Sequence, residues 1–371
     1  MRPAIAMVLV VFVFWGASPG AANAQEPGAA PRMAAVSRNA EAVAAQPMQA
    51  PVLGFVSLAP AGTSGRRVHA GSEPVYSGAR LRLNAIVGVP GSAALSGPLA
   101  IPANVASIHF APGQEYAIVE MEPGESVALA QFAGTQMLPP AALPTGLMAP
   151  DLISFSPSAS AAVLFSAAQP RVAVLTGLPG TPQLARQMEG SALPADISEL
   201  AIADDGATII AGTSDGRVLL LAGDGSQRLL YSAGELGGIA FVPGSSDAVV
   251  FDRQGGRAML IANAATAPAM RPLAEGLSAP QTGASMLQVD TRAVVVSATG
   301  ASDVWRIDLQ TQQVQDIHLS SALTMMQPLR AAGRYLLSAQ PGQPAWVLDT
   351  SGETSGVFFV PRQTAAARMI R

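Results

Sequence analysis

Short apolar-rich runs, separated by turn-forming residues, fill most of the chain after residue 50. One unit holds four such runs, at residues 200–203, 208–211, 218–222 and 228–232, and Asp and Gly stand between them. Runs of this length bounded by Gly and Asp are typical of β-strands joined by tight turns. The pattern therefore predicts four antiparallel strands in this unit, which we name strands A to D in chain order.

Three Asp-Gly pairs occupy the junctions of this unit, and they raise the question of whether they bind a cation or turn the chain. The pairs are Asp205-Gly206, Asp215-Gly216 and Asp224-Gly225. Glycine accepts a positive φ at little cost and Asp bonds its own backbone, so the pair suits a tight hairpin. The spacing of an EF-hand calcium loop is absent from this stretch. We therefore interpret all three pairs as hairpin turns.

The same pattern recurs along the chain. Copies of the first strand and turn begin at Ile108, Ile153, Leu200, Ile239, Met286 and Met326, which are 45, 47, 39, 47 and 40 residues apart. A repeat of this length is typical of propeller blades and exceeds that of leucine-rich or ankyrin units. The third strand supports the same repeat. The predicted strands C occur at the same position within their units, in "RVAVLT", "GRVLLLA", "GRAMLIA", "DVWRIDL" and "AWVLDT".

The fold class predicted from these repeats is all-β, a β-propeller built from four-stranded antiparallel blades. Six repeats are visible, and the segment 52–99 precedes them. That segment forms either a full blade with a long insertion, "GTSGRRVHAGSEPVYSGAR", or only outer strands. We expect seven blades, with six as the alternative, and ring closure between the N-terminal strands and the C-terminal unit that ends in "VFFVPR".

The turns that follow the first strand of each unit, "HFAPG", "FSPS" and "FVPG", resemble those of secreted bacterial β-propellers of the broad YVTN/NHL/WD-repeat type. The resemblance covers about residues 52–362. It implies a ring whose faces and central channel bind partners, and it carries over no catalytic residue. No "YVTN" tetrapeptide and no Gly-His…Trp-Asp pair is present, so the subfamily stays open.

The N-terminus has the pattern of an export signal. Arg2 precedes the apolar run "AIAMVLVVFVFW", and Ala22-Asn23-Ala24 forms an A-x-A cleavage site. We expect a signal peptide over 1–24, an Ala- and Pro-rich linker over 25–50, one propeller domain over 51–362 and a tail over 363–371. This predicts a secreted or periplasmic bacterial protein with no membrane span after cleavage.

Composition narrows the function classes. The net charge is −4, which gives no electrostatic reason to expect nucleic-acid binding. The absence of cysteine excludes disulfides, thiolate metal sites and thiol nucleophiles. Lysine is absent too, so all 21 basic residues are arginine.

The strongest candidate for binding is a column of charged residues. Arg171, Arg217 and Arg257 each come directly before a predicted strand C, and Asp303 occupies the same position in the next unit. Turns between the second and third strands of all blades open on one face, so these side chains should form an arc there. Because guanidinium groups suit carboxylates and phosphates, the arc predicts an anionic partner. The alternative is that each arginine caps its turn and lies over a neighbouring blade.

Evidence for catalysis is close to nil. His69, His109 and His318 are far apart and match no metal-ligand spacing, and no nucleophile elbow or phosphate-binding loop occurs. Some propeller enzymes of the gluconolactonase type hold a channel calcium, for which the candidates here are Glu120, Asn263, Asp252 and Asp303. The densest acidic loop contains Glu120 and Glu122. Acidic residues at strand ends are more often solvated turn residues.

The sequence thus predicts a non-catalytic, extracytoplasmic binding scaffold at the cell envelope. Its candidate binding residues are Arg171, Arg217, Arg257, Asp303, Glu120 and Glu122, and we expect no cofactor and no metal. The partner is either an envelope protein or an anionic ligand, and the oligomeric state stays open. The alternative function is a hydrolase or lactonase-like enzyme with a metal in the central channel.

Overall fold

The computed structural model describes residues 50–58, 81–122, 126–144, 146, 150–194, 196–278, 284–338, 344–352 and 354–361. The predicted signal peptide, most of the predicted linker, the insertion at 62–80 and the predicted tail lie outside these residues. Contact clustering places residues 49–371 in one compact unit. All regular structure described below belongs to that unit.

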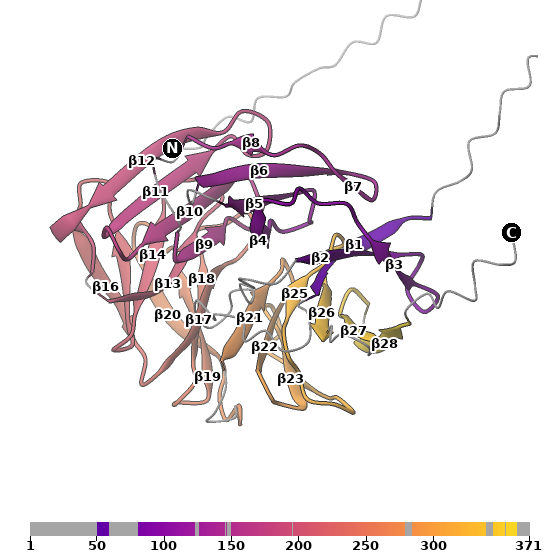
Figure 1. Ribbon diagram of the computed structural model, residues 1–371. Coiled ribbons are helices and arrows are strands. Elements are labelled where there is room, and N and C mark those ends of the chain that lie inside the picture. The colour runs from indigo at the N-terminus through magenta and orange to yellow at the C-terminus, as the bar shows by residue number, and fades with distance from the viewer. Residues whose placement is uncertain are drawn as a thin grey trace, which may run out of the picture. The chain divides into compact units, whose positions relative to one another are not determined.

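Seven antiparallel sheets make up the described residues, and each sheet is built from consecutive strands (Figure 1). We number the sheets in chain order. Sheet 1 holds β1 (Val52–Leu58), β2 (Arg82–Val87) and β3 (Ala94–Pro98). Sheet 2 holds β4 (Val105–Phe110), β5 (Tyr116–Met121), β6 (Ser126–Ala133), β7 (Gln136–Met137) and β8 (Ala141–Ala142). Sheet 3 holds β9 (Leu152–Phe155), β10 (Ala161–Ser166), β11 (Arg171–Thr176) and β12 (Gln183–Glu189).

Sheets 4 to 7 repeat the four-stranded order in sequence. Sheet 4 holds β13 (Ile197–Ile202), β14 (Ile209–Thr213), β15 (Arg217–Leu221) and β16 (Gln227–Ser232). Sheet 5 holds β17 (Leu236–Phe241), β18 (Ala248–Asp252), β19 (Arg257–Ala262) and β20 (Ala269–Ala274). Sheet 6 holds β21 (Ser285–Val289), β22 (Ala293–Ala298), β23 (Asp303–Asp308) and β24 (Val314–His318). Sheet 7 holds β25 (Gln327–Pro328), β26 (Arg334–Ser338), β27 (Ala345–Asp349) and β28 (Gly356–Val360).

The hydrophobic core closes these sheets into a ring. The described residues contain seven clusters of buried apolar side chains, and six of them lie between two consecutive sheets. The remaining cluster joins sheet 7 to sheet 1 through residues such as Leu53, Ile86, Leu336 and Val347. Sheets that pack face to face around a closed circle form a β-propeller. The fold is therefore a seven-bladed β-propeller, as the repeat length predicts.

The second strand of each blade explains why the sequence is so apolar. Every residue of β10, β14, β18 and β22 is buried, because a neighbouring blade covers each face of its sheet. Strands buried on both faces have near-continuous apolar runs rather than alternation. Runs such as "AVVF" and "AVVVSA" therefore mark the blade interior.

The turns predicted at the Asp-Gly pairs are present. Gly206, Gly216 and Gly225 have φ of 65°, 87° and 83°, in the left-handed region that glycine enters most easily. The carboxylate of Asp205 accepts hydrogen bonds from the backbone N–H groups of Ala207 and Thr208 at 2.7 and 2.8 Å. These pairs are hairpin turns, as predicted.

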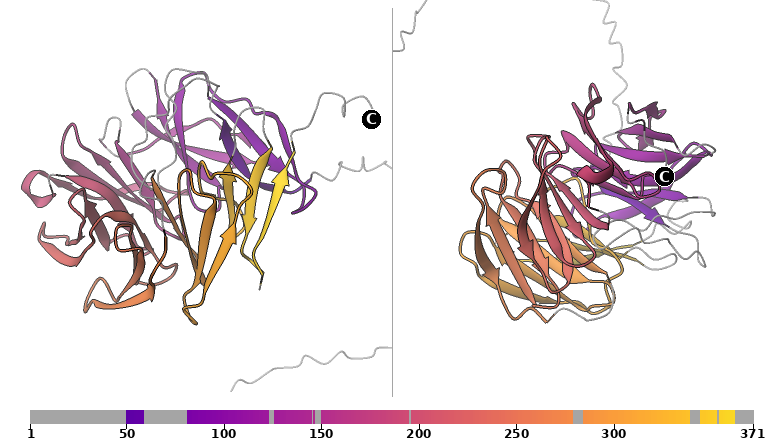
Figure 2. Two further views of the ribbon diagram at one scale, coloured as in Figure 1. Left: turned by 90° about the horizontal axis from the view of Figure 1, so that it is seen from below. Right: turned by 90° about the vertical axis from the view of Figure 1, so that its left-hand side faces the viewer.

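Sheet 1 differs from the other blades in the described residues, where it has three strands. Its strands do not join the hydrogen-bonded order of sheet 7, and the two meet by packing and by a hydrogen bond from Leu95 N to Pro361 O at 2.9 Å. Figure 2 shows the last sheet, in yellow, beside the first, in indigo. The predicted closure between the chain's two ends is thus made by packing and by backbone hydrogen bonds.

Candidate functional site

The charged column predicted from the sequence occupies equivalent positions in four consecutive blades. Arg171, Arg217, Arg257 and Asp303 are the first residues of β11, β15, β19 and β23, the third strands of sheets 3 to 6. All four therefore lie at the end of the blades that carries the turns between second and third strands. No hydrogen bond or ion pair joins them to one another within the described residues. Each instead binds a partner close by in its own blade.

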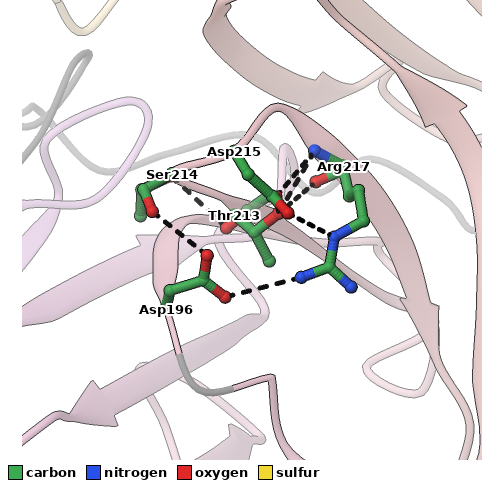
Figure 3. Close-up of polar contacts among 7 residues, drawn as sticks. Asp196, Thr213, Ser214, Asp215 and Arg217 are labelled. Carbon is green, nitrogen blue, oxygen red and sulfur yellow. Dashed lines mark hydrogen bonds and ion pairs between the residues drawn. The ribbon is translucent and has the colours of Figure 1, made fainter.

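Arg217 lies between two carboxylates (Figure 3). Its Nε donates to Asp215 Oδ2 at 2.7 Å, and its Nη2 is 3.7 Å from Asp196 Oδ1. Thr213 Oγ1 donates to the other oxygen of Asp215, and this bond together with Arg217 lowers the pKa of that carboxyl. The guanidinium stays 45% exposed. The turn between β14 and β15 thus presents a small network with more negative than positive charge.

Arg257 and Arg171 form the corresponding pairs in the neighbouring blades. Arg257 Nε donates to Asp252 Oδ2 at 3.2 Å, and the hydrogen bond raises the pKa of this 46% exposed guanidinium. Arg171 Nε lies 3.0 Å from Glu189 Oε1, its register partner on β12. Its Nη1 also donates to Gly146 O at 3.3 Å. Both arginines therefore link the start of the third strand to another strand of the same sheet.

Asp252 is the buried member of the group, with 1% of its side chain exposed. Its carboxylate accepts the Gly255 N–H at 3.0 Å, the Gly234 N–H at 3.2 Å and the Tyr231 hydroxyl at 3.2 Å, besides Arg257. A carboxylate with this many donors organises both turns that flank it. Its first role in this fold is structural.

Asp303 pairs with His318 rather than with an arginine. Asp303 Oδ1 is 2.7 Å from His318 Nδ1, and the two residues are register partners on β23 and β24. The histidine side chain is 76% exposed. The column thus ends in a carboxylate–imidazole pair at the surface, and each of its four charged side chains has a partner.

The two acidic candidates of sheet 2 have different surroundings. Glu120 Oε1 lies 2.9 Å from His109 Nε2, and Ser107 Oγ lies 3.2 Å from the same ring nitrogen. Glu122 follows the end of β5 and is exposed. His109, which the sequence analysis counts among isolated histidines, is therefore held by a carboxylate of its own sheet.

The residues considered for a channel calcium do not come together. Asp252 ends β18 and Asn263 follows β19, so the two lie at opposite ends of sheet 5, while Glu120 and Asp303 belong to sheets 2 and 6. None of the four lines the central cavity. The described residues also contain no group of three or more His, Cys, Asp or Glu that could hold a metal ion.

A central cavity of about 210 Å³ lies where the inner strands of sheets 2 to 7 meet. Its polar lining side chains are His109, Ser154, Glu199, Gln288 and Gln327. Burial raises the pKa of Glu199 to about 8. Sequence reasoning missed Glu199, Gln288 and Gln327. For Gln288 and Gln327 the available signal was a polar residue in the first strand of an otherwise apolar repeat, whereas Glu199 precedes the predicted strand.

A second cavity, of about 240 Å³, lies between sheets 6 and 7. His318, Ser338 and Trp346 are among its lining residues, and the Trp346 ring meets Phe359 edge-on with centroids 6.3 Å apart. Trp305, at the same strand position one blade earlier, is buried between sheets 5 and 6. The two tryptophans therefore share a position in the repeat but not an environment.

Comparison with known proteins supports the fold alone. No family model matches the chain, and no curated protein matches it either. A solved protein from Lactobacillus plantarum is similar with a TM-score of 0.52 and 12% identity, over 85% of this chain and 98% of that chain. The WD40 repeats of RRP9 are similar with a TM-score of 0.50 and 9% identity, over 85% of this chain and 86% of that chain.

A third similar structure is PorZ of Porphyromonas gingivalis, described as a bacterial surface component of the type-IX secretion system. Its TM-score is 0.49 at 12% identity, over 84% of this chain. The present chain spans only 39% of the PorZ chain. In the described residues, no helix is long and apolar enough to cross a membrane.

Proposed function

We propose that this protein is a non-catalytic binding scaffold of the bacterial cell envelope. The observation that carries the proposal is the column at one end of sheets 3 to 6, where charged side chains recur in consecutive blades and stay partly exposed. Exposed ion pairs contribute little to folding free energy, typically 0 to about 1 kcal/mol. A repeated, ordered set of them suits recognition of a partner better than stabilisation of the fold.

The charge balance selects the class of partner. The three guanidiniums face four carboxylates, those of Glu189, Asp215, Asp196 and Asp252. A polyanion would meet more negative than positive charge on this face. A protein surface with charges of both signs fits it better, since complementary pairs fix register and exclude wrong partners. We therefore propose an envelope protein as the partner, in preference to an anionic ligand.

Arg257 can take part in binding without losing its own pair. Arg257 uses only Nε for Asp252 among the described residues, so both terminal nitrogens remain for a partner. Such a fork donates two parallel hydrogen bonds to a carboxylate. Glu122 extends the same end of the ring to sheet 2 as an exposed acceptor.

The envelope location rests on the sequence of residues 1–24, which the structure does not describe. We propose that they form a signal peptide cleaved after Ala24, that 25–50 form a linker, 51–362 the propeller domain and 363–371 a tail. Mass spectrometry of the protein recovered from its source organism tests the first boundary. An N-terminus at Gln25 is expected, and an intact N-terminus at Met1 would contradict it.

The binding role is tested by capture from the envelope fraction of the source organism with the mature chain. A column variant carries Arg171→Ala, Arg217→Ala and Arg257→Ala. The matched control carries Arg186→Ala, Arg228→Ala and Arg271→Ala, three arginines on the fourth strands of the same sheets. Circular dichroism and thermal unfolding establish that both variants are folded.

We expect one protein to be retained by the wild type and the control and lost from the column variant. The purified partner should then bind the column variant at least tenfold more weakly, which corresponds to about 1.4 kcal/mol. Equal retention by all three chains would remove the column from the proposal. Retention of nothing by the wild type would contradict the scaffold function itself.

A further inference from the structure

The central cavity carries a second inference, which goes beyond the proposed function because it concerns the channel and not the charged column. The cavity of about 210 Å³ is lined by the first strands of six blades, β4, β9, β13, β17, β21 and β25. Its lining combines apolar residues, such as Leu152, Leu200, Ile239 and Leu287, with a nearly equal polar surface. Apolar surface together with a few placed polar groups is the usual form of a small-molecule site.

Glu199 is the one acidic side chain among the residues that line this cavity. It follows a β-bulge in β13, where the register with β14 shifts between Ile197 and Glu199. The same bulge in β4 and β17 is followed by Ser107 and Gly238. A carboxyl group thus stands at a bulge where β4 has a serine and β17 a glycine. The Glu199 carboxyl has no hydrogen-bond partner among the described side chains, and its surroundings disfavour the charged form.

Gln327 provides an independent indication of a binding site. Its side chain lines the same cavity and is 4% exposed. Its Nε2 is buried without a hydrogen-bond partner in the described residues. An unsatisfied buried donor destabilises the folded state, so such a group usually has a partner in the functional state. Gln288 on β21 adds a second amide to the lining.

We propose that the channel binds a small amine that also carries a hydroxyl or carbonyl oxygen. Its ammonium group pairs with Glu199, and its oxygen accepts a hydrogen bond from Gln327. The amide oxygen of Gln288 and the hydroxyl of Ser154 are further acceptors for the ammonium protons. The apolar lining residues surround the carbon chain. Both unpartnered groups of the cavity are then satisfied by one ligand.

The chemistry of the lining favours an amine over a metal ion. Calcium takes 6 to 8 oxygen ligands, usually with several carboxylates, whereas this cavity offers one carboxyl. The other titratable lining residue is His109, which Glu120 and Ser107 hold on its own sheet. The lining residues from β9, β17, β21 and β25 contain no titratable group. A monovalent organic cation therefore matches the single charge available.

Binding of an amine should release a proton from Glu199, and this release can be measured. A carboxyl group with a pKa of about 8 is roughly 90% protonated at pH 7. Pairing with an ammonium group requires the ionised form, so the proton leaves Glu199 for the buffer as the amine binds. Nearly one proton should be released per amine bound at pH 7. A site built on a carboxylate that is already ionised would release none.

The test is calorimetric titration of the mature protein with ethanolamine at pH 7, in phosphate and in MOPS buffer. The two buffers differ in ionisation enthalpy, so the difference in heat reports the protons released. Glu199→Gln keeps the shape of the side chain and removes its charge. Asp316→Asn, at an exposed carboxylate on β24 outside the channel, is the control. Ethylamine and calcium chloride are the comparison ligands.

We expect ethanolamine to bind the wild type and Asp316→Asn with release of nearly one proton. Glu199→Gln should bind about tenfold more weakly or worse, without proton release. Ethylamine, which lacks the oxygen, should bind the wild type more weakly than ethanolamine, and Gln327→Met should remove that difference. The proposal is overturned if ethanolamine gives no heat at tens of millimolar, if Glu199→Gln binds it unchanged, or if calcium alone binds.

Discussion

The side chain of Gln114 joins three blades by bonding the backbone of Phe55. Its Oε1 accepts the Phe55 N–H at 2.6 Å, and its Nε2 donates to Pro328 O at 2.9 Å. Gln114 belongs to the turn after β4, Phe55 to β1 and Pro328 to β25, so the contact links sheet 2 to sheets 1 and 7. Because the residue is fully buried, these bonds are shielded from water. The Gln114 side chain therefore stabilises the ring closure between sheets 7 and 1.

Gln114→Ala should destabilise the ring at its closure. The substitution leaves the Phe55 N–H and the Pro328 carbonyl buried without a partner, and each such group costs about 1 to 3 kcal/mol. We expect the free energy of unfolding to fall by about 2 to 4 kcal/mol, measured by urea titration. Gln313→Ala, at an exposed glutamine of sheet 6, should change it by less than about 0.5 kcal/mol. Equal effects of the two substitutions would contradict the closure role.

The blades could be predicted from the sequence, while this contact could not. Burial of each sheet on both faces imposes the same apolar pattern every 39 to 47 residues, which makes the repeat visible. Gln114 lies in "APGQEY", where the pattern predicts only a hairpin turn. Its bond to Pro328 spans 214 residues of sequence, and no local pattern encodes a partner at that separation.

Asp252 should matter more to stability than the arginine it binds. Asp252→Ala removes the acceptor for the N–H groups of Gly234 and Gly255 and leaves the Tyr231 hydroxyl without this partner. We expect a loss of about 3 kcal/mol, measured by thermal unfolding. Arg257→Ala leaves those bonds in place and should cost much less. A larger effect of Arg257→Ala would show that the ion pair, and not the turn, is the stabilising element.

We expect protonation of Asp205, in its Asp-Gly turn, to lower the stability of the fold in acid. Partial burial alone would raise the pKa of this carboxyl, but hydrogen bonds from Thr208 and Ala207 outweigh it and lower the pKa. The folded state then holds fewer protons than the unfolded state near the ordinary Asp value of about 3.9. The stabilisation is present above that pH and is lost as the pH falls through the folded pKa.

Asp205→Asn should therefore reduce the loss of thermal stability between about pH 5 and pH 2. The measurement is the midpoint of thermal unfolding across this range, for the variant and the wild type. Asp316→Asn, at an exposed aspartate on β24, is the control. An Asp205→Asn curve parallel to that of the wild type would show that the turn contributes nothing to acid sensitivity.

The sequence predicts where the candidate binding residues lie, but not which charged partners they bind. The repeat correctly places Arg171, Arg217 and Arg257 at the start of the third strands. Their partners depend on register, because Glu189 reaches Arg171 only through the pairing of β11 with β12. Glu199 was invisible for another reason. In "DISEL" it resembles a solvated acid before a strand, and only the closed ring shows that it lines a cavity.

Glu199 predicts a pH dependence opposite in sign to that of Asp205. Its folded pKa of about 8 lies above the ordinary Glu value of about 4.3, because burial disfavours the charged form. Between these values the folded state keeps a proton that the unfolded state has lost. Stability from this group is thus full below about pH 4 and falls as the pH rises, until the folded carboxyl ionises near pH 8.

Glu199→Gln removes this titration and should flatten the alkaline side of the stability profile. At pH 9 the variant should unfold at a higher temperature than the wild type, since it no longer holds an ionised carboxylate in the cavity. At pH 4 the two should be nearly equal, because a protonated carboxyl and an amide are similar in size and charge. Thermal unfolding at both pH values, without amine in the buffer, makes the comparison. A wild type that is the more stable chain at pH 9 would mean that the carboxylate has a favourable partner within the folded protein.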